Sequence, residues 1–392
     1  MEESVVDQAT GVARTSWLKR LGQAVVGVVI GLVAIVASVV VLFWNEGRAI
    51  KTAQGLSEGA SILRSVASEH VDPANEGRLI HVTGPLTTGA PVADSDFAVR
   101  SRGVRLVRQV EMYQWREESQ FDGRSAPGGG DERRTTYQYV RGWSDRPVDS
   151  TGFKEPRGHT NPLMVFPPRD IVAPGTRLGA FAVPEPLLRS FGAPTPLAVT
   201  DIQATALQIR VNKPASIVDG LLYVGRDAAQ PAIGDLRVAF SEVPLQTASI
   251  VAAQSGDGFA PFPTRTGRAV ELMAAGAVPA ANMFKEAEQE NATLVSILRV
   301  VGVIVMFVGF SLILRRLGVA ADVIPWLGSI LRVGSGLAAI VCTLALATIV
   351  IAMGWLWVRP LTGVAVLAGG AVATYALMRL VRLRATRKAR PA

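Results

Sequence analysis

The stretch that decides the fold is LGQAVVGVVIGLVAIVASVVVLFW, residues 21–44, which contains no charged side chain. At a rise of about 1.5 Å per residue, an α-helix of this length crosses a hydrocarbon core of about 30 Å. The run is longer than the apolar part of a signal peptide, and it leads into Asn45 and Glu46 without a cleavage site of small residues. It therefore predicts an uncleaved membrane span near the N-terminus.

Three further apolar runs lie toward the C-terminus. Residues 294–314 are apolar except for Arg299, residues 333–358 carry no charge, and residues 361–378 follow after a short Arg-Pro turn. The mean hydropathy is +0.30 although the middle of the chain is polar. The sequence therefore predicts four transmembrane helices, one N-terminal and three C-terminal.

Basic residues flank these spans and predict how the chain crosses the membrane. Arginine and lysine gather in residues 1–20, 315–332 and 379–392. Because short basic segments stay in the cytoplasm, these three segments are predicted to be a cytoplasmic N-terminal tail, an interfacial loop and a basic C-terminal tail. Residues 45–293 then form one large extracytoplasmic domain, the outer domain.

Composition limits the class of protein further. A net charge of +8 would be typical of nucleic-acid binding in a soluble protein, but here it is concentrated in the membrane flanks, so nucleic acid is not an expected partner. The only cysteine, Cys342, lies inside the third span, so the outer domain is expected to rely on its core and not on disulfides. The preference for arginine over lysine, with abundant Ala, Val and Gly, is typical of a GC-rich bacterial genome and favours a bacterial plasma membrane.

The outer domain shows mainly strand patterns. Residues 104–115 and 135–143 predict an antiparallel pair with aromatic side chains facing each other, joined by a glycine-rich hairpin tip. Further strands are predicted at residues 204–211, 221–224, 236–240 and 249–254, and helices at residues 184–191 and 281–290, the second continuing into the second span. NEGRAI at 45–50 and NEGRLI at 75–80 are interpreted as two similar turns. The predicted fold class is α+β, with four membrane helices and a β-rich outer domain.

Six short motifs follow one another in an order that is known from one family. They are NEGRA at 45–49, NEGRL at 75–79, VEMYQW at 110–115, GH at 158–159 with NP at 161–162, GDLRV at 234–238, and GW at 354–355 with RP at 359–360. In these motifs the chain resembles the transmembrane protein 43 family, also called LUMA, over roughly residues 20–360.

The resemblance implies four spans around a large lumenal or extracytoplasmic domain, the same arrangement as the apolar runs predict. Animal members are organisers of the nuclear envelope and endoplasmic reticulum that self-associate and contact lamins and emerin, and channel-related roles have also been put forward. Since a bacterium has no lamina, the resemblance implies self-association and membrane organisation here, without those partners. It implies no catalytic residue.

Motifs for catalysis and cofactor binding are not found in the sequence. His70, His81 and His159 stand far apart and outside any metal-ligand spacing, and no phosphate-binding or nucleophile motif occurs, so no metal, cofactor or enzyme activity is expected. Asp94 and Asp96 are interpreted as a solvated loop and not as a catalytic carboxylate pair.

His159 is the best single candidate for a functional side chain in the outer domain. It lies among the turn formers of residues 158–162, together with Asn161. The favoured interpretation is that His159 and Asn161 cap a loop through hydrogen bonds to the backbone.

Five further residues complete the set of candidates. Arg48 and Arg78 follow glycine in acidic turns and are expected to form ion pairs or contact headgroups. Arg299 is the only charge within a span; it is expected to extend to the headgroups, the alternative being a partner in the helix bundle or an ion path. Trp355 fits the aromatic belt at the interface, and Arg359 lies in the tight turn between the last two spans.

The function that these patterns favour is a non-enzymatic membrane scaffold. Its outer domain is expected to recognise a second copy, another membrane protein or a lipid, with the bilayer itself as a permanent partner. The alternative is a channel or lipid-transfer component with a cavity in the outer domain. No Asp or Glu lies inside any predicted span, so a proton-coupled transporter would lack its usual groups.

Overall fold

The structure is a computed structural model that describes residues 5–15, 17–125, 131–211, 213–317, 335–356 and 360–388. The described chain divides into two compact units. The membrane unit contains the first helix up to Glu58, the loop Thr264–Arg268 and the chain from Phe284 onward; the β-rich unit contains the first strand, Gly59–Pro263 and Ala269–Met283. The glycines of the predicted hairpin tip, most of the predicted interfacial loop and Arg359 lie outside the described residues.

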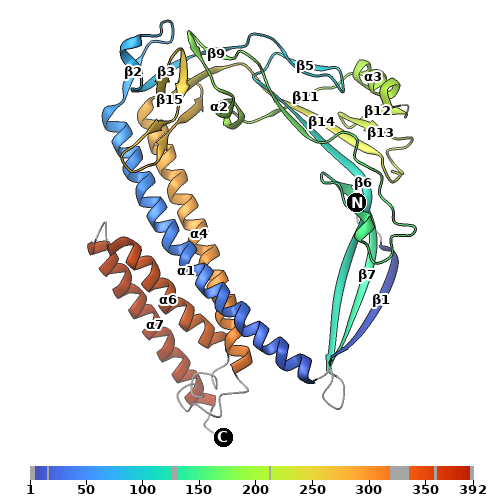
Figure 1. The fold of residues 1–392 in the computed structure, drawn as a ribbon, viewed down its shortest axis with the longest axis vertical. Coiled ribbons are helices and arrows are strands. Elements are labelled where there is room, and N and C mark those ends of the chain that lie inside the picture. Colours follow the sequence, from blue (N-terminus) through green and yellow to red (C-terminus); the bar gives the residue numbers. More distant parts are fainter. Residues whose placement is uncertain are drawn as a thin grey trace. The chain divides into compact units, whose positions relative to one another are not determined.

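Among the described residues, four helices are long and apolar enough to cross a membrane. Two of them lie wholly in the membrane unit and two lie largely in it. They are α1 (Trp17–Ile62), α4 (Ala280–Leu317), α6 (Ser335–Leu356) and α7 (Pro360–Lys388). α1 and α4 lie side by side, and α6 and α7 form a hairpin (Figure 1). Leu42, Met306 and Val350 bring α1, α4 and α6 into one buried cluster. Their outward faces expose large apolar side chains such as Val33, as a surface in contact with lipid requires.

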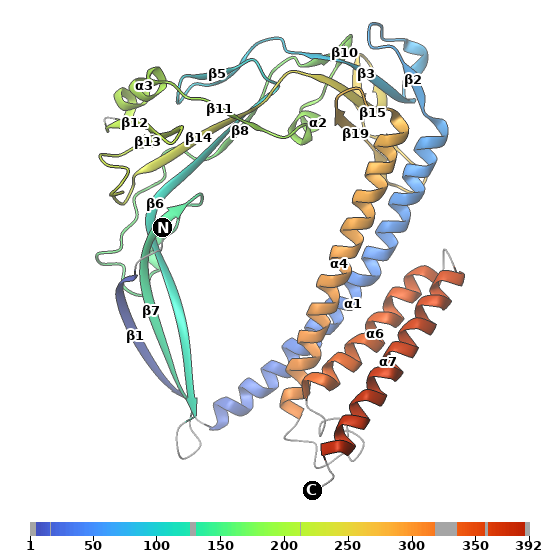
Figure 2. The same cartoon turned by 180° about the vertical axis from the view of Figure 1, so that it is seen from behind.

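The larger sheet of the β-rich unit has the strand order β1-β7-β6-β14-β13-β12, with β8 paired to β6 and β11 to β14. Its strands are β1 (Val5–Thr15), β6 (Arg105–Ser125), β7 (Asp131–Ser144), β8 (Arg169–Val172), β11 (Thr195–Leu197), β12 (Ala215–Val218), β13 (Leu221–Val224) and β14 (Leu236–Val243). Figure 2 shows β6, β7 and β1 running side by side. In the antiparallel register of β6 and β7, Tyr113 is opposite Trp143 and their ring centroids are 5.3 Å apart.

The second sheet contains a closed ring of strands. It comprises β2 (Arg64–Val66), β3 (Leu79–Thr87), β9 (Arg177–Leu178), β10 (Phe181–Ala182), β15 (Thr247–Ser255), β16 (Gly258–Ala260) and β19 (Leu272–Ala275). The pairings run from β3 to β9, β10, β16 and β15 and return to β3, with β2 and β19 attached outside this path. Closure of the path satisfies backbone groups that an open sheet would leave at its edges.

Two hydrophobic cores stabilise the β-rich unit. The first lies on the larger sheet, where Val110 and Val238 pack with Leu207 of the helix α3 (Asp201–Val211). The second gathers side chains of the closed ring, among them Ile80 and Phe181. The remaining elements are the helix α2 (Glu185–Ser190), the pairs β4 (Val92–Asp94) with β5 (Val99–Ser101) and β17 (Phe262–Pro263) with β18 (Ala269–Val270), and the 3-10 turns Pro73–Asn75 and Ser150–Gly152.

The structure confirms the predicted α+β class, with one N-terminal and three C-terminal candidate spans. The predicted strands at residues 221–224, 236–240 and 249–254 lie within β13, β14 and β15. The predicted antiparallel pair is β6 and β7, although Trp115 faces Arg141, whose guanidinium lies 5.4 Å from the indole ring. The helix predicted at residues 281–290 continues into the second span as α4.

The prediction of a strand at residues 204–211 was wrong, because these residues belong to α3. Ala204 and Leu207 are buried three residues apart, which is a helical and not a strand spacing. The helix begins with a capping arrangement in which the N–H of Thr200 donates to Oε1 of Gln203 at 2.7 Å. The spacing of threonine and glutamine was the signal that the strand prediction overlooked.

One further prediction was wrong about a segment near the N-terminus. The motif at residues 45–50 is not a turn but part of α1; only the copy at residues 75–80 turns, with Gly77 at φ +69°. Residues 5–15, predicted as part of the cytoplasmic N-terminal tail, form the strand β1, antiparallel to β7, and their side of the membrane stays a prediction. Strand pairing depends on a partner distant in sequence, which a local pattern of basic residues does not reveal.

Candidate functional site

A bidentate ion pair joins α1 and α4 in the membrane unit. Nε of Arg299 donates to Oε1 of Glu46 at 2.6 Å, and Nη2 donates to Oε2 at 2.7 Å. The Glu46 side chain is 0% exposed and that of Arg299 is 31% exposed. Such a parallel pair of charge-assisted bonds is strong and directional, and either charge alone would be costly in this place.

The third helix of the bundle covers this pair. The guanidinium carbon of Arg299 lies 6.0 Å from the ring centroid of Trp355. A Cβ on the neighbouring Gly354 would lie 2.6 Å from Cβ of Glu46, so only glycine permits this approach of α6. The candidates Arg299 and Trp355 are thus brought together around Glu46.

The expectation that Arg299 extends alone to the headgroups was wrong, and the alternative of a partner in the bundle is the one observed. Glu46 was assigned to the outer domain because it lies two residues beyond the apolar run that ends at Trp44. α1 continues as a helix to Ile62, so Glu46 faces the bundle. A carboxylate just past an apolar run and an arginine just inside another were the signal for the pair.

Close backbone contacts and amide side chains support the same helix pair. A Cβ on Gly31 would lie 2.7 Å from the carbonyl oxygen of Gly309, so glycine on both helices allows the backbones to touch. Asn45 donates through Nδ2 to the carbonyl of Val295 at 3.1 Å, and Asn291 donates to the carbonyl of Ala49 at 3.1 Å. Asn45 and Glu46 of the first family motif therefore serve helix association.

His159 lies in an aromatic cluster of the β-rich unit. Its ring stacks on Tyr139 at 3.9 Å between centroids with an interplanar angle of 14°, and meets the edge of Trp115 at 4.7 Å and 88°. Nδ1 lies 2.9 Å from the carbonyl oxygen of Glu155, which can only accept, so this nitrogen carries a proton. His159 is 5% exposed and functions as a packed side chain.

Tyr139 connects the histidine to an acidic residue. Its hydroxyl donates to Oε2 of Glu117 at 2.9 Å and accepts from the N–H of Glu155 at 2.9 Å. Burial, and next the hydrogen bond to Glu117, raise the pKa of Tyr139 to about 12. The tyrosine is therefore neutral at physiological pH and acts as a structural donor.

Asn161 replaces a strand partner at the edge of this cluster. Its Oδ1 accepts from the N–H of Trp115 at 2.7 Å, and its Nδ2 donates to the carbonyls of Trp115 at 2.9 Å and Val148 at 3.2 Å. The N–H of Asn161 donates to Oγ of Ser150 at 2.9 Å. This matches the predicted interpretation of His159 and Asn161 as residues that hold a loop through backbone hydrogen bonds.

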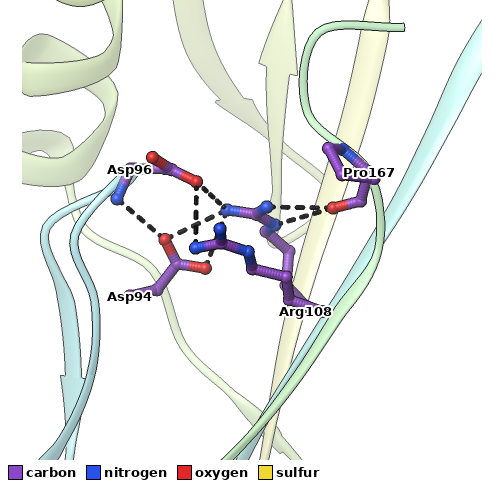
Figure 3. A network of polar contacts seen from close by, with 5 residues as sticks. Asp94, Asp96, Arg108 and Pro167 are labelled. Carbon is purple, nitrogen blue, oxygen red and sulfur yellow. Dashed lines mark hydrogen bonds and ion pairs between the residues drawn. The ribbon is translucent and has the colours of Figure 1, made fainter.

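The most deeply buried charges of the β-rich unit surround Arg108 on β6 (Figure 3). Nη1 of Arg108 donates to Oδ2 of Asp94 at 2.8 Å and to Oδ2 of Asp96 at 3.0 Å. Nε and Nη2 donate to the carbonyl of Pro167 at 3.2 Å and 2.9 Å, and the guanidinium lies 4.9 Å from the Phe97 ring centroid. The network ties β4, β6 and the chain before β8 together.

The interpretation of Asp94 and Asp96 as a solvated loop was wrong. The side chains of Asp94 and Arg108 are both 0% exposed, and that of Asp96 is 19% exposed. Burial is possible because Arg108 supplies the opposite charge and enough donors to satisfy both carboxylates. The carboxylates are committed to this structural role, so the network offers no free acid or base.

The two remaining described candidates are separate from these networks. Arg48 lines a hollow of about 660 Å³ beside Trp44, and its Nε and Nη2 are buried without a hydrogen-bond partner among the residues that the structure describes. Arg78 is exposed after the turn at Gly77, and neither arginine has an ion-pair partner within the described ranges. The first of the two expectations, an ion pair, is not observed for these residues, and contact with headgroups stays a prediction.

These arrangements of side chains give little support to a catalytic function. Within the described part of the chain, no three His, Cys, Asp or Glu side chains lie close enough to hold a metal ion. The buried charges and the aromatic cluster bind other parts of the protein, as the distances above show.

Comparison with known proteins gives a consistent result. A family model described as Transmembrane protein 43 matches residues 112–360. Transmembrane protein 43 of Rattus norvegicus is 31% identical over 367 residues, which cover 90% of this chain and 90% of that protein. The Homo sapiens protein is 31% identical over 362 residues, which cover 89% of this chain and 88% of that protein. The Drosophila melanogaster homolog is 29% identical over 360 residues, which cover 87% of this chain and 91% of that protein. No solved structure matches the chain.

Proposed function

The chain belongs to the transmembrane protein 43 family of membrane proteins, and from this premise we propose that it is a non-enzymatic membrane scaffold. Its membrane helices anchor it in the bilayer, and its β-rich unit binds a second copy of the same chain. The observation that carries the proposal is an apolar surface on the β-rich unit.

This apolar surface is defined by four large side chains. Leu163 is 85% exposed, Val165 68%, Ile202 76% and Ile209 78%. They are the most exposed large apolar side chains of the β-rich unit among the described residues. Large apolar side chains with such exposure on a folded unit favour a surface that binds another macromolecule.

Residues 163–166 and α3 expose these side chains, and other side chains of the same two segments pack in the core of the larger sheet. Met164 and Phe166 alternate with Leu163 and Val165 and point into the core of the larger sheet, where they join Ala204 and Leu207 of α3. Ile202 and Ile209 lie two helical turns apart on the outward side of α3. The exposed residues are therefore held on well-packed elements and not on a loose loop.

A hollow beside the surface gives it a shape that complements itself. The hollow has a volume of about 550 Å³ and is lined by Leu163, Val165, Phe166 and Lys213, among others. Leu163 projects from the face on which the hollow opens. Two copies related by a twofold axis can therefore each insert Leu163 into the hollow of the other copy. Asn161 supports this arrangement because its bonds to Trp115 fix the chain just before Leu163.

We propose no enzymatic reaction, because the polar groups that could serve catalysis are bound within the fold. His159, Tyr139 and Arg108 are buried and Glu117 is half-buried; these groups have the chemistry to serve catalysis, and each is bound to another part of the fold. The preference for arginine over lysine, with abundant Ala, Val and Gly, supports a bacterial plasma membrane as the location, and the basic flanks support an extracytoplasmic β-rich unit.

The test is the oligomeric state of the purified full-length protein in detergent, measured by light scattering and by chemical crosslinking across a dilution series. We expect more than one copy per particle for the wild type and a shift to single copies for the Leu163→Asp/Ile202→Asp variant. Leu245→Asp serves as the matched control, because Leu245 is also exposed, at 39%, but lies outside the apolar surface. A wild type that stays monomeric at every concentration, or a double variant that assembles as the wild type does, would contradict the proposal.

A further inference from the structure

The hollow beside Arg48 lies where α1 changes from apolar to basic. Val40, Phe43 and Trp44 line its apolar part and are 60%, 56% and 58% exposed. Arg48 and Lys51 follow four and seven residues after Trp44, so one face of the helix presents apolar side chains first and cations next. Arg48 lies about 6 Å along the helix axis beyond Trp44, the depth at which headgroups begin after an interfacial tryptophan.

Three cations line the basic part of the hollow, and no carboxylate of the described residues lines it. Arg48 and Lys51 come from α1, and Arg268 comes from the loop Thr264–Arg268. The two carboxylates of α1 in this region are already bound, Glu46 to Arg299 and Glu58 to Arg265. Among the described residues, Nε and Nη2 of Arg48 are buried with no hydrogen-bond partner. Arg268 adds electrostatic repulsion, so the cluster favours an anion.

Contacts with α1 hold the loop that supplies Arg268. Oγ1 of Thr266 donates to the carbonyl of Lys51 at 3.0 Å, and the N–H of Arg265 donates to Oε2 of Glu58 at 3.0 Å. A Cβ on Gly55 would lie 3.0 Å from Oγ1 of Thr264, so the loop packs closely on the helix. Arg268 is therefore positioned in advance and does not depend on a ligand to bring it to the hollow.

We propose that this hollow binds an anionic phospholipid, with Arg48, Lys51 and Arg268 around the headgroup phosphate and Val40, Phe43 and Trp44 along an acyl chain. Guanidinium groups match the oxygens of a phosphate in geometry and charge. A free phosphate would use only the basic part, whereas a lipid uses both parts of the hollow and reaches it from the bilayer. The site lies in the membrane unit and is independent of self-association through the β-rich unit.

The probes are phosphatidylglycerol and phosphatidylcholine, added at equal mole fractions to the full-length protein in detergent. Binding is measured by native mass spectrometry and by the shift in melting temperature. We expect phosphatidylglycerol to bind in preference, and the Arg48→Gln/Arg268→Gln variant to lose about fivefold in affinity for each cation removed. Arg265→Gln is the matched control, since Arg265 belongs to the same loop but its side chain is 95% exposed and does not line the hollow.

A second variant keeps every charge and blocks the space. A Cβ on Gly47 would meet no atom within 4 Å, so Gly47→Leu folds without a clash and extends into the hollow that Gly47 lines. We expect it to weaken phosphatidylglycerol binding as the double variant does. Equal loss in Arg265→Gln would show nonspecific charge attraction and overturn the proposal. Inorganic phosphate that competes as well as the lipid would overturn it too, because the site would then bind a soluble anion.

Discussion

Arg108 and Asp94 show how single residues decide the stability of the β-rich unit. Both side chains are fully buried, each charge is compensated by the other, and Arg108 also donates to the Pro167 carbonyl. Removing one partner of a buried pair leaves the other charge without compensation, which costs more than the pair itself contributes. The stability of this region therefore depends on both partners being present together.

We expect Arg108→Met to reduce the free energy of unfolding by about 3 to 5 kcal/mol, because Asp94 would remain buried and unpaired. Adding Asp94→Asn should recover much of this loss, since a neutral amide needs no counter-charge. Thermal unfolding of the detergent-solubilised protein measures both changes. Arg169→Met is the control: Arg169 reaches Asp96 at 3.4 Å, but its side chain is 51% exposed, and the loss should stay below about 1 kcal/mol. Equal losses in both single variants would contradict the importance of burial.

His81 gives the β-rich unit a dependence on pH. Burial lowers the pKa of His81 below its usual 6.5, although the hydrogen bond to the carbonyl of Val278 opposes the shift. A lowered pKa in the folded state means that the unfolded chain takes up the proton more readily. The contribution of neutral His81 to stability is therefore complete above about pH 6.5 and is lost as the pH falls through the lower, folded-state pKa.

We expect the melting temperature of the wild type to fall more steeply than that of His81→Gln as the pH is lowered from about 7 to about 5. Glutamine retains an N–H donor for the Val278 carbonyl but does not titrate. Melting curves of both proteins in matched buffers measure the difference, and parallel pH profiles would contradict the role of His81.

Residue-scale roles could be predicted from sequence only where the partner is local. His159 and Asn161 were recognised because the turn formers around them are neighbours in the chain. Asp94 was misread because its partner, Arg108, is brought to it by the folding of β4 against β6, which the spacing of the acids does not reveal.

At the scale of elements, α1 and α4 form the central pair of the membrane unit. Gly31 and Gly309 allow the helices to approach, and Glu46 and Arg299 fix their rotation and register. Because little hydrophobic driving force exists between helices inside lipid, such polar and small-residue contacts determine which helices associate.

We expect Arg299→Lys to lower the melting temperature, because a single ammonium cannot make both bonds of the planar guanidinium. Arg299→Leu should lower it further, since Glu46 is 0% exposed and would be left unpaired. Adding Glu46→Gln to Arg299→Leu should restore part of the loss, which distinguishes a lost pair from a general defect. A silent Arg299→Lys would mean that the arginine extends to the headgroups after all.

The same variants test the alternative of a conduit. Reconstituted wild-type and Arg299→Lys proteins should both show no ion flux across liposomes, because the arginine is bound to Glu46 and does not line a path for ions. A conductance in the wild type that changes with Arg299→Lys would contradict the scaffold proposal.

The helices and strands could be predicted from sequence where the local pattern of apolar residues fits only one type of secondary structure. The uncharged runs predicted the four spans, and the strands predicted at residues 221–224, 236–240 and 249–254 lie within β13, β14 and β15. Residues 204–211 were misassigned because a short apolar run fits a strand and a helix equally well, and the decisive residues, Thr200 and Gln203, lie at its start. The family motif at residues 45–50 resembles a turn in composition, yet packing against α4 keeps it helical.

At the scale of the whole molecule, two of the boundaries between the two units fall inside long helices and not in linkers. One boundary follows Glu58 within α1, and the other follows Met283 within α4. From the basic flanks we predict that the N-terminal and C-terminal tails lie on one side of the membrane and the β-rich unit on the other. β1 conflicts with this arrangement, because its pairing with β7 would place the N-terminal residues on the side of the β-rich unit.

Single cysteines at Ala9, Ala229 and Ala385, introduced into a Cys342→Ser background, decide the topology. We expect an impermeant thiol reagent to label intact cells at Ala229 only, because a helix that crosses once has its ends on opposite sides of the membrane. β1 would then separate from β7 in the inserted protein. Labelling at Ala9 together with Ala229 would show that β1 stays paired and that α1 does not cross. Labelling at Ala385 would contradict the placement of the C-terminal tail.

The Glu46–Arg299 pair has a consequence for the order in which the protein is made. The two residues are 253 positions apart, so a ribosome working at roughly 5 to 20 residues per second delivers Arg299 between roughly 10 and 50 s after Glu46. During this interval α1 already occupies the bilayer, and its Glu46 carboxylate has no ion-pair partner. When α4 leaves the translocon, its arginine would cost less to insert alone than the roughly 2.5 to 3.5 kcal/mol of an arginine at the centre of a span, and the carboxylate of α1 offsets that cost. The helix α1 thus assists the membrane insertion of α4. In a chain that lacks α1, we expect α4 to insert into the membrane less efficiently.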